Sequence, residues 1–195
     1  MNVIGLTGSV GSGKSTIGKL LEEHFSVKLL MTDQIGHLAM APGTSSYDKI
    51  VSVFQREILK EDQTIDRGKL SEIVFADAGK LEQLNGIIHP WVKDYLKETI
   101  ETEKQAGRYE YCVIESAILF QTQLDQMCDH VWYVDTEDSV RRQRLKQSRG
   151  YTDAKIDSIL KEQEENEQLK TRCQYVIENN GELSSVLSQL EKLVV

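Results

Sequence analysis

The stretch Gly8-Ser9-Val10-Gly11-Ser12-Gly13-Lys14-Ser15 matches the pattern G-x-x-x-x-G-K-[ST] at every fixed position. It follows the apolar run Val3 to Thr7, which is typical of a buried strand, and it precedes a helical repeat of apolar residues from Ile17 to Phe25. Between a strand and a helix, this pattern predicts a loop that closes around phosphate, with the N–H groups of the helix start facing the anion.

The residues of this loop have expected roles toward a nucleotide triphosphate. Glycine tolerates positive φ angles, so its backbone can wrap closely around a phosphate. The loop residues expected to contact ATP are Gly8, Gly11, Ser12, Gly13, Lys14, Ser15 and Thr16. Among them, Lys14 adds a full charge beside the β- and γ-phosphates and is expected to be catalytic, and the Ser15 hydroxyl is a ligand for Mg²⁺.

Composition limits the other possibilities. The chain has 195 residues, 23 Lys and Arg and 31 Asp and Glu, which gives a net charge of −8. No stretch approaches the roughly 18 apolar residues that span a bilayer, and the acidic balance disfavours general binding to nucleic acid. The chain opens directly into a strand without a basic leader, and its three cysteines lack a CxxC pair. We expect a cytoplasmic protein with reduced thiols.

Short apolar runs and helical segments alternate along the chain, which predicts an α/β fold on a parallel sheet. Five strands are expected, at residues 3–7, 27–31, 111–114, 130–134 and 175–177. The gap between the second and the third is far longer than a crossover needs, and its apolar residues recur at helical spacing. The sequence therefore predicts a helical insertion in the α/β core, and a terminal helix that packs on the sheet.

Asp33 is the candidate for the catalytic base. Asp33-Gln34-Ile35-Gly36 matches the DxxG pattern of GTPases, but the chain has no guanine-reading NKxD after a later strand. Asp33 closes the second predicted strand, and ligands of doubly wound sheets bind at the carboxyl ends of strands. A carboxylate there can take the proton of an attacking hydroxyl. The structural alternative is an N-cap for a helix that starts at Gln34.

Further acids and bases follow later strands. Glu115 ends the third strand and Asp135 the fourth; either could hold Mg²⁺, Glu115 is preferred, and both could instead be helix caps. The segment 141–149 carries five basic residues and predicts a lid whose arginines neutralise the transferring phosphoryl group, with Arg144 and Arg149 as the main candidates. The acidic run at residues 161–167 is expected to be a solvated helix, and some of the arginines are expected to be structural.

The sequence resembles the dephospho-CoA kinases along nearly its whole length. Five blocks carry the likeness: Gly5-Leu6-Thr7-Gly8 with Gly11 to Thr16; Asp33-Gln34-Ile35; Asp66-Arg67 with Leu70 and Val74-Phe75; His89-Pro90; and Val176 to Gly181. The His-Pro pair and the late Asn-Asn-Gly are more specific than the phosphate loop, which many kinases share. From the residues alone, His89 beside proline would mark the entry to a helix.

The resemblance implies ATP-dependent phosphorylation of the ribose 3′-hydroxyl of dephospho-CoA, the last step of coenzyme A synthesis. From the residues we expect Mg²⁺ beside the ATP, and a monomer, since no large apolar helix face demands a partner. The resemblance also implies that Asp33 is the base, that Arg67 and His89 line the acceptor side, and that Asn179 and Gly181 lie near the adenine. The implied architecture is a three-layer P-loop kinase fold, a five-stranded parallel sheet with a helical insertion and a lid. Its parts are a nucleotide-binding core of residues 1–36, 106–140 and 171–195, an acceptor subdomain of residues 37–105 and a lid of residues 141–170.

The chain departs from the family pattern at several places. Met31 stands where a second Asp is usual, and Ala117 to Gln121 replaces Pro-Leu-Leu-Phe-Glu. The lid arginines Arg144 and Arg149 are five apart rather than four, with Ser148 at the usual place. Two rivals stay open: a kinase for a nucleoside or nucleoside monophosphate, which a panel of acceptors separates, and an ATP-responsive binding protein, which would release no ADP.

Overall fold

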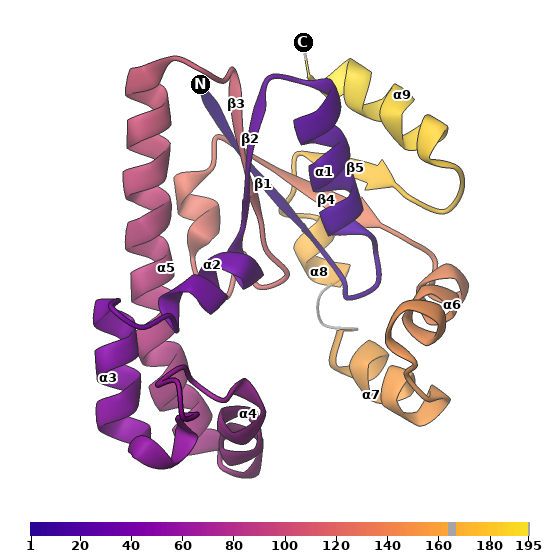
Figure 1. The fold of residues 1–195 in the computed structure, drawn as a ribbon. Helices are drawn as coiled ribbons and strands as arrows, with labels where there is room; N and C mark the ends of the chain where they lie inside the picture. The colour runs from indigo at the N-terminus through magenta and orange to yellow at the C-terminus, as the bar shows by residue number, and fades with distance from the viewer. Residues whose placement is uncertain (164–166, 195) are drawn as a thin grey trace. The chain divides into compact units, whose positions relative to one another are not determined.

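The structure, a computed structural model, describes residues 1–163 and 167–194. Its five strands form one parallel sheet in the order β2-β3-β1-β4-β5. They are β1 (Asn2–Gly8), β2 (Val27–Met31), β3 (Tyr111–Glu115), β4 (His130–Asp135) and β5 (Tyr175–Glu178). All five coincide with the predicted strands to within two residues, so the predicted α/β fold on a five-stranded parallel sheet is confirmed (Figure 1).

The remaining chain is mostly helical. In chain order the helices are α1 (Lys14–His24), α2 (Thr32–Ala39), α3 (Ser45–Phe54), the 3₁₀ turn η1 (Arg56–Ile58), α4 (Arg67–Ala76), α5 (Ala78–Ala106), the 3₁₀ turn η2 (Leu124–Met127), α6 (Asp138–Arg149), α7 (Asp153–Gln163), α8 (Glu167–Lys170) and α9 (Leu183–Leu193). The expected lid, residues 141–170, includes residues 164–166, which lie outside the described residues. The acidic run predicted as a helix, residues 161–167, spans the same three residues.

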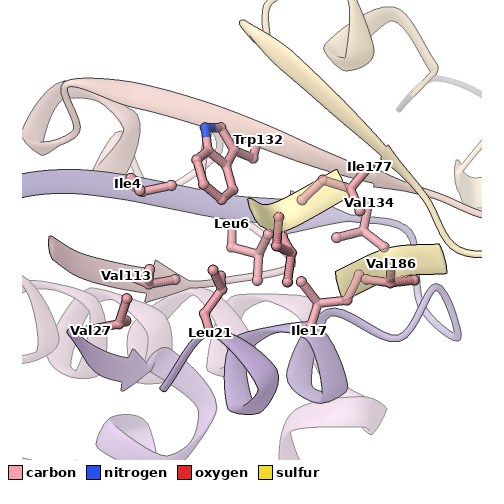
Figure 2. Packing of buried hydrophobic residues seen from close by; sticks show 11 residues of the cluster. Ile4, Leu6, Ile17, Leu21, Val27, Val113, Trp132, Val134, Ile177 and Val186 are labelled. Carbon is pink, nitrogen blue, oxygen red and sulfur yellow. The ribbon is translucent and has the colours of Figure 1, made fainter. Parts of the chain in front are cut away.

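The chain divides into two compact units, residues 1–31 with 103–195, and residues 32–102. The first unit holds the sheet. One face of the sheet is covered by α1 and α9, which contribute Ile17, Leu21, Val186 and Leu190 to a core with Ile4, Leu6, Val113, Trp132, Val134 and Ile177 (Figure 2). The other face meets the segment after β3, where Leu119 packs so closely on Gly5 that an added Cβ would lie 2.7 Å from it.

The second unit has a core of its own. Its helices share a buried apolar cluster of Ile50, Phe54, Ile58, Ile65, Leu70, Val74 and Leu84. The predicted helical character of the insertion is therefore confirmed. One prediction inside it is wrong: Pro90 lies within α5, so the His89-Pro90 pair does not mark a helix entry. Proline removes one backbone hydrogen bond from a helix, and the rest of this 29-residue helix holds the segment helical around it.

The three cysteines are free thiols; Cys112 is buried, and Cys128 and Cys173 are partly buried. Burial raises the pKa of Cys112 and of Cys128 to about 12, and the pKa of Cys173 to about 11. Because the thiolate is the reactive form, burial makes these thiols less reactive than exposed cysteines. Among the described residues, no helix is long and apolar enough to cross a membrane.

The resemblance includes Asp66, and the structure gives this residue a structural role. Asp66 is the N-cap of α4, where its Oδ1 accepts hydrogen bonds from the N–H groups of Gly68 at 3.0 Å and Lys69 at 3.2 Å. These bonds satisfy donors that the first turn of a helix leaves without an intrahelical acceptor. The same helix carries Arg67 at its first position, so the cap fixes the start of the helix that presents Arg67.

We predict that Asp66→Ala lowers the free energy of unfolding by about 1 kcal/mol, because the two donors lose their acceptor. Asp66→Asn should keep nearly full stability, since an asparagine oxygen caps as well as aspartate. Urea unfolding followed by far-UV circular dichroism measures both. Equal destabilisation by the two substitutions would contradict the capping role.

Candidate active site

The predicted phosphate loop, residues 8–13, joins the end of β1 to the start of α1. Gly11 has a φ of 82° and Gly13, the N-cap of α1, has a φ of 91°. A Cβ added to Gly11 would lie 3.0 Å from Leu145, and one added to Gly13 would lie 2.4 Å from Nδ2 of Asn179. Both the backbone angle and the close neighbours therefore require glycine at these positions.

Lys14 folds back over this loop. Its side-chain nitrogen donates hydrogen bonds to the carbonyl oxygens of Gly8 at 2.9 Å and Ser9 at 3.0 Å, and the residue is buried. The ammonium charge therefore lies against the loop backbone. Ser15 and Thr16, in the first turn of α1, are exposed. Their position at a helix start, next to a buried cation, suits the binding of an anion.

The carbonyl oxygen of Ser12 is the acceptor for donors from three different elements. Nδ2 of Asn179, just after β5, lies 2.7 Å from it, and Oγ1 of Thr136, just after β4, lies 3.0 Å from it. Nη1 of Arg144, on α6, lies 3.4 Å away. Sequence reasoning missed Thr136; its signal was its place directly after the carboxyl end of a strand that neighbours β1. Asn179 and Arg144 were predicted as site residues, Asn179 for a place near the adenine, and the structure turns the Asn179 side chain to the loop.

The basic segment 141–149 forms most of α6. Three of its five basic residues make ion pairs with acids on α6 or α7: Arg141 with Asp138 at 3.4 Å, Arg142 with Asp157 at 2.6 Å and Lys146 with Asp153 at 2.7 Å. The guanidinium of Arg149 lies 5.9 Å from the ring centre of Tyr151. Arg144 reaches the phosphate loop, where its Nη1 lies 3.4 Å from the Ser12 carbonyl oxygen. Several of the basic residues thus have structural partners.

Leu145 connects α6 to the loop by packing. It is buried with Ile156 and Leu160 of α7, and Val10 of the loop packs on the same cluster. Its side chain is also the neighbour that a Cβ on Gly11 would meet. The helix that carries the arginines therefore contacts the phosphate loop directly.

The two strand-end acids differ in their surroundings. Glu115 ends β3 and is buried; its Cα pairs with Leu6 of β1 and Met31 of β2, so it lies at the carboxyl edge of the sheet, near the start of the loop. Asp135 ends β4 and forms an ion pair with Lys170. Among the described residues there is no group of three or more His, Cys, Asp or Glu side chains that could hold a metal. An exposed Ser15 hydroxyl and one carboxylate fit Mg²⁺, which takes few protein ligands alongside phosphate oxygens.

Asp33 lies in the first turn of α2, in the unit of residues 32–102. The helix begins at Thr32, so the alternative that Asp33 caps a helix starting at Gln34 is wrong. Asp33 is two residues past the end of β2, and in a parallel sheet that end shares an edge with the carboxyl ends of β1 and β3. A carboxylate in the first turn of a helix is also favoured by the helix dipole.

The unit of residues 32–102 contains a pocket of about 520 Å³. Its walls are mainly apolar, and its polar members include His37, Arg67 and Ser71. Phe75, of which 83% is exposed, also lines it. His37 is one helical turn after Asp33 on α2, so both lie on the same side of that helix. His89 is absent from the described lining; its ring is half-buried, and burial lowers its pKa.

Comparisons with known proteins agree along the whole chain. A sequence model of the Dephospho-CoA kinase family matches residues 2–185. A Dephospho-CoA kinase of Geobacter sulfurreducens is 34% identical over 195 residues, covering 99% of this chain and 97% of the relative. One from Fusobacterium nucleatum is 34% identical over 190 residues, covering 97% of this chain and 95% of the relative.

Solved structures show the same fold. The structure of Dephospho-CoA kinase from Campylobacter jejuni superposes with a TM-score of 0.73 at 21% identity, over 99% of this chain and 97% of the other. A shikimate kinase from Acinetobacter baumannii superposes with a TM-score of 0.57 at 16% identity, over 100% of this chain and 93% of the other. With the family match and the sequence relatives, the conclusion is that this chain belongs to the dephospho-CoA kinase family, the kinases that transfer phosphate from ATP to dephospho-CoA.

Proposed function

We propose that this protein phosphorylates the ribose 3′-hydroxyl of dephospho-CoA with ATP and Mg²⁺, through the residues described above. The observation that carries the proposal is the phosphate loop, whose glycines leave no space for side chains and which ends at the start of α1. Residues 8–16 would hold the phosphates through backbone N–H groups and the hydroxyls of Ser15 and Thr16. Lys14 would place its ammonium group against the β- and γ-phosphates.

Mg²⁺ and the adenine of ATP would bind at different parts of the site. Ser15 would coordinate Mg²⁺ directly and Glu115 would hold it through water; the ion neutralises charge on the phosphates. The adenine would lie beside the exposed residues that follow β5, where Asn180 and Gly181 reach solvent. The side chain of Asn179 is turned to the loop, so its backbone is the part left for a contact with the base.

The acceptor is proposed to bind to the unit of residues 32–102. Dephospho-CoA combines an anionic diphosphate with a pantetheine arm, and the pocket offers Arg67 and His37 beside apolar walls. Because His37 is one turn from Asp33, a ribose hydroxyl at Asp33 would leave the diphosphate near these two side chains. His89 is proposed to contribute from α5, although it does not line the pocket itself.

In the reaction, the Asp33 carboxylate would accept the proton of the 3′-hydroxyl. The 3′-oxygen then forms a bond to the γ-phosphorus while the bond from that phosphorus to the bridging oxygen breaks, and ADP leaves. Arg144 and Arg149 would approach the equatorial oxygens, where negative charge spreads in the transition state. We propose that residues 141–170 act as the lid, residues 37–105 as the acceptor subdomain and the remaining residues as the nucleotide-binding core.

We further propose that the protein acts as a monomer in the cytoplasm and does not bind nucleic acid. Three free thiols suit a reducing compartment. The net charge of −8 opposes a general attraction to nucleic acid. Sedimentation velocity at several concentrations tests the oligomeric state.

A panel of acceptors tests the substrate. With ATP and Mg²⁺, we expect ADP release with dephospho-CoA at a kcat/KM at least about 100-fold above that with adenosine, AMP or shikimate, because only dephospho-CoA fills both the Asp33 site and the pocket. Coupled detection of ADP measures each rate. Preference for a nucleoside or its monophosphate would overturn the proposed substrate, and ATP binding without ADP release would overturn the kinase reaction.

Substitution of Asp33 tests the catalytic base. Asp33→Asn should lower kcat by roughly 10²- to 10⁴-fold, because an amide cannot accept the proton, while the far-UV spectrum stays unchanged. Lys14→Ala should lower kcat/KM for ATP by a similar factor. Asp48→Asn, which neutralises an exposed acid of α3 in the same unit, is the matched control and should keep wild-type rates. Near-full activity of Asp33→Asn at saturating substrates would show that the base is another group.

The role of the pocket is tested through Arg67. Arg67→Ala should raise the KM for dephospho-CoA about 10-fold, the usual effect of losing a charge-assisted hydrogen bond to phosphate, and leave the KM for ATP within twofold. The control is Lys69→Ala, which removes the same charge from the same helix at a position outside the described pocket lining. Steady-state kinetics with each substrate varied gives both values. Equal effects of the two substitutions would mean that only the general charge of α4 matters.

A further inference from the structure

We propose that Asn179 is a positioning residue for the phosphate loop: its amide holds the Ser12–Gly13 peptide so that the N–H of Gly13 faces the nucleotide phosphates. This inference rests on the proposed binding of phosphate to residues 8–16. It gives a role to a side chain that acts through the loop backbone and not on the base of the nucleotide.

The amide of Asn179 makes a short hydrogen bond to the loop. Nδ2 of Asn179 lies 2.7 Å from the Ser12 carbonyl oxygen, the shortest of the three donors to that oxygen, and Asn179 is only 2% exposed. Thr136 Oγ1 reaches the same oxygen at 3.0 Å and is also buried. In such surroundings a carbonyl without donors is costly, so the peptide strongly prefers the orientation that meets both.

The Ser12–Gly13 peptide needs a restraint, because it can rotate. A trans peptide is planar, with its C=O and N–H pointing in opposite directions. When the Ser12 oxygen points to Asn179, the Gly13 N–H therefore points away from Asn179. Gly13, with a φ of 91°, gives this peptide unusual freedom to rotate, because glycine has no Cβ penalty. A rotated peptide would turn the carbonyl oxygen toward the phosphates and repel them.

Asn179 is itself held in place on both its backbone and its side chain. Its backbone N–H donates to the Asp135 carbonyl at 2.9 Å, which extends the pairing of β5 with β4. Its Oδ1 lies 3.5 Å from Nη2 of Arg144, so the amide nitrogen faces the carbonyl and the amide oxygen faces the guanidinium. The opposite orientation of the amide would place oxygen against oxygen. Arg144 on α6 thus supports both the amide and the carbonyl that the amide holds.

The test compares two ligands that share phosphates and differ in the base. Asn179→Leu keeps the approximate shape of the side chain and removes the donor. We expect it to weaken the binding of ATP and of inorganic tripolyphosphate by the same factor, about 10-fold or more, in isothermal titration calorimetry of the full chain. The KM for dephospho-CoA should stay within twofold of wild type. Thr136→Val, which removes the second donor, should weaken both ligands about threefold or more.

The matched control is Gln189→Leu. Gln189 is also an amide, and it bonds both backbone groups of Glu178, the residue before Asn179, at 2.9 Å, without a described contact to the loop. This variant should bind both ligands as wild type does. If Asn179 instead contacted adenine, Asn179→Leu would weaken ATP and leave tripolyphosphate unchanged, which would overturn the proposal.

Two further outcomes would also count against it. If Asn179→Leu and Gln189→Leu weakened ligand binding equally, the effect would come from general disruption of the end of β5. If Asn179→Leu does not fold, Thr136→Val decides, and unchanged binding of both ligands by that variant overturns the proposal. Failure of the wild-type protein to bind either ligand would instead overturn the proposed function, which separates the two conclusions.

Discussion

The structure depends on how closely the phosphate loop approaches its neighbours. The loop packs against β4, the residue after β5 and the basic helix α6: a Cβ on Gly8 or Gly13 would lie within 2.5 Å of a neighbouring atom, and one on Gly11 would lie 3.0 Å from Leu145. Such contacts require the ends of three strands and one helix to meet at the same edge of the sheet. The parallel order with β1 in the centre of the sheet satisfies this requirement. The loop is therefore shaped as much by residues far away in the sequence as by its own glycines.

This dependence explains what could be predicted from the sequence. The strands and most helices were predictable, because apolar periodicity reports burial and the loop pattern is local. The predicted segments 27–31 and 175–177 differ from β2 and β5 by at most one residue. The continuity of α5 through Pro90 was not predictable from local rules, because packing along the rest of a long helix outweighs one missing hydrogen bond.

The site was only partly predictable for a related reason. The loop, Lys14 and Arg144 were found because pattern or charge marks them. Thr136 could not be singled out, because one threonine after a strand has no distinctive spacing, and its role appears only when β4 lies beside β1. Likewise, the sequence put Arg144 and Arg149 forward equally, whereas the structure places Arg144 at the loop and the guanidinium of Arg149 5.9 Å from the ring centre of Tyr151. Long-range neighbours, absent from any local pattern, make these distinctions.

The chain passes between the two units at two places, after Met31 and after Thr102. At the first, β2 ends at Met31 and α2 begins at Thr32; at the second, between Thr102 and Glu103, α5 passes through without interruption. In the described structure, neither crossing contains loop residues. The chain therefore joins the two units through a continuous helix at one place and through a direct strand-to-helix junction at the other. The strand-to-helix junction lies one residue from Asp33, so the backbone angles that set the start of α2 also set the position of Asp33.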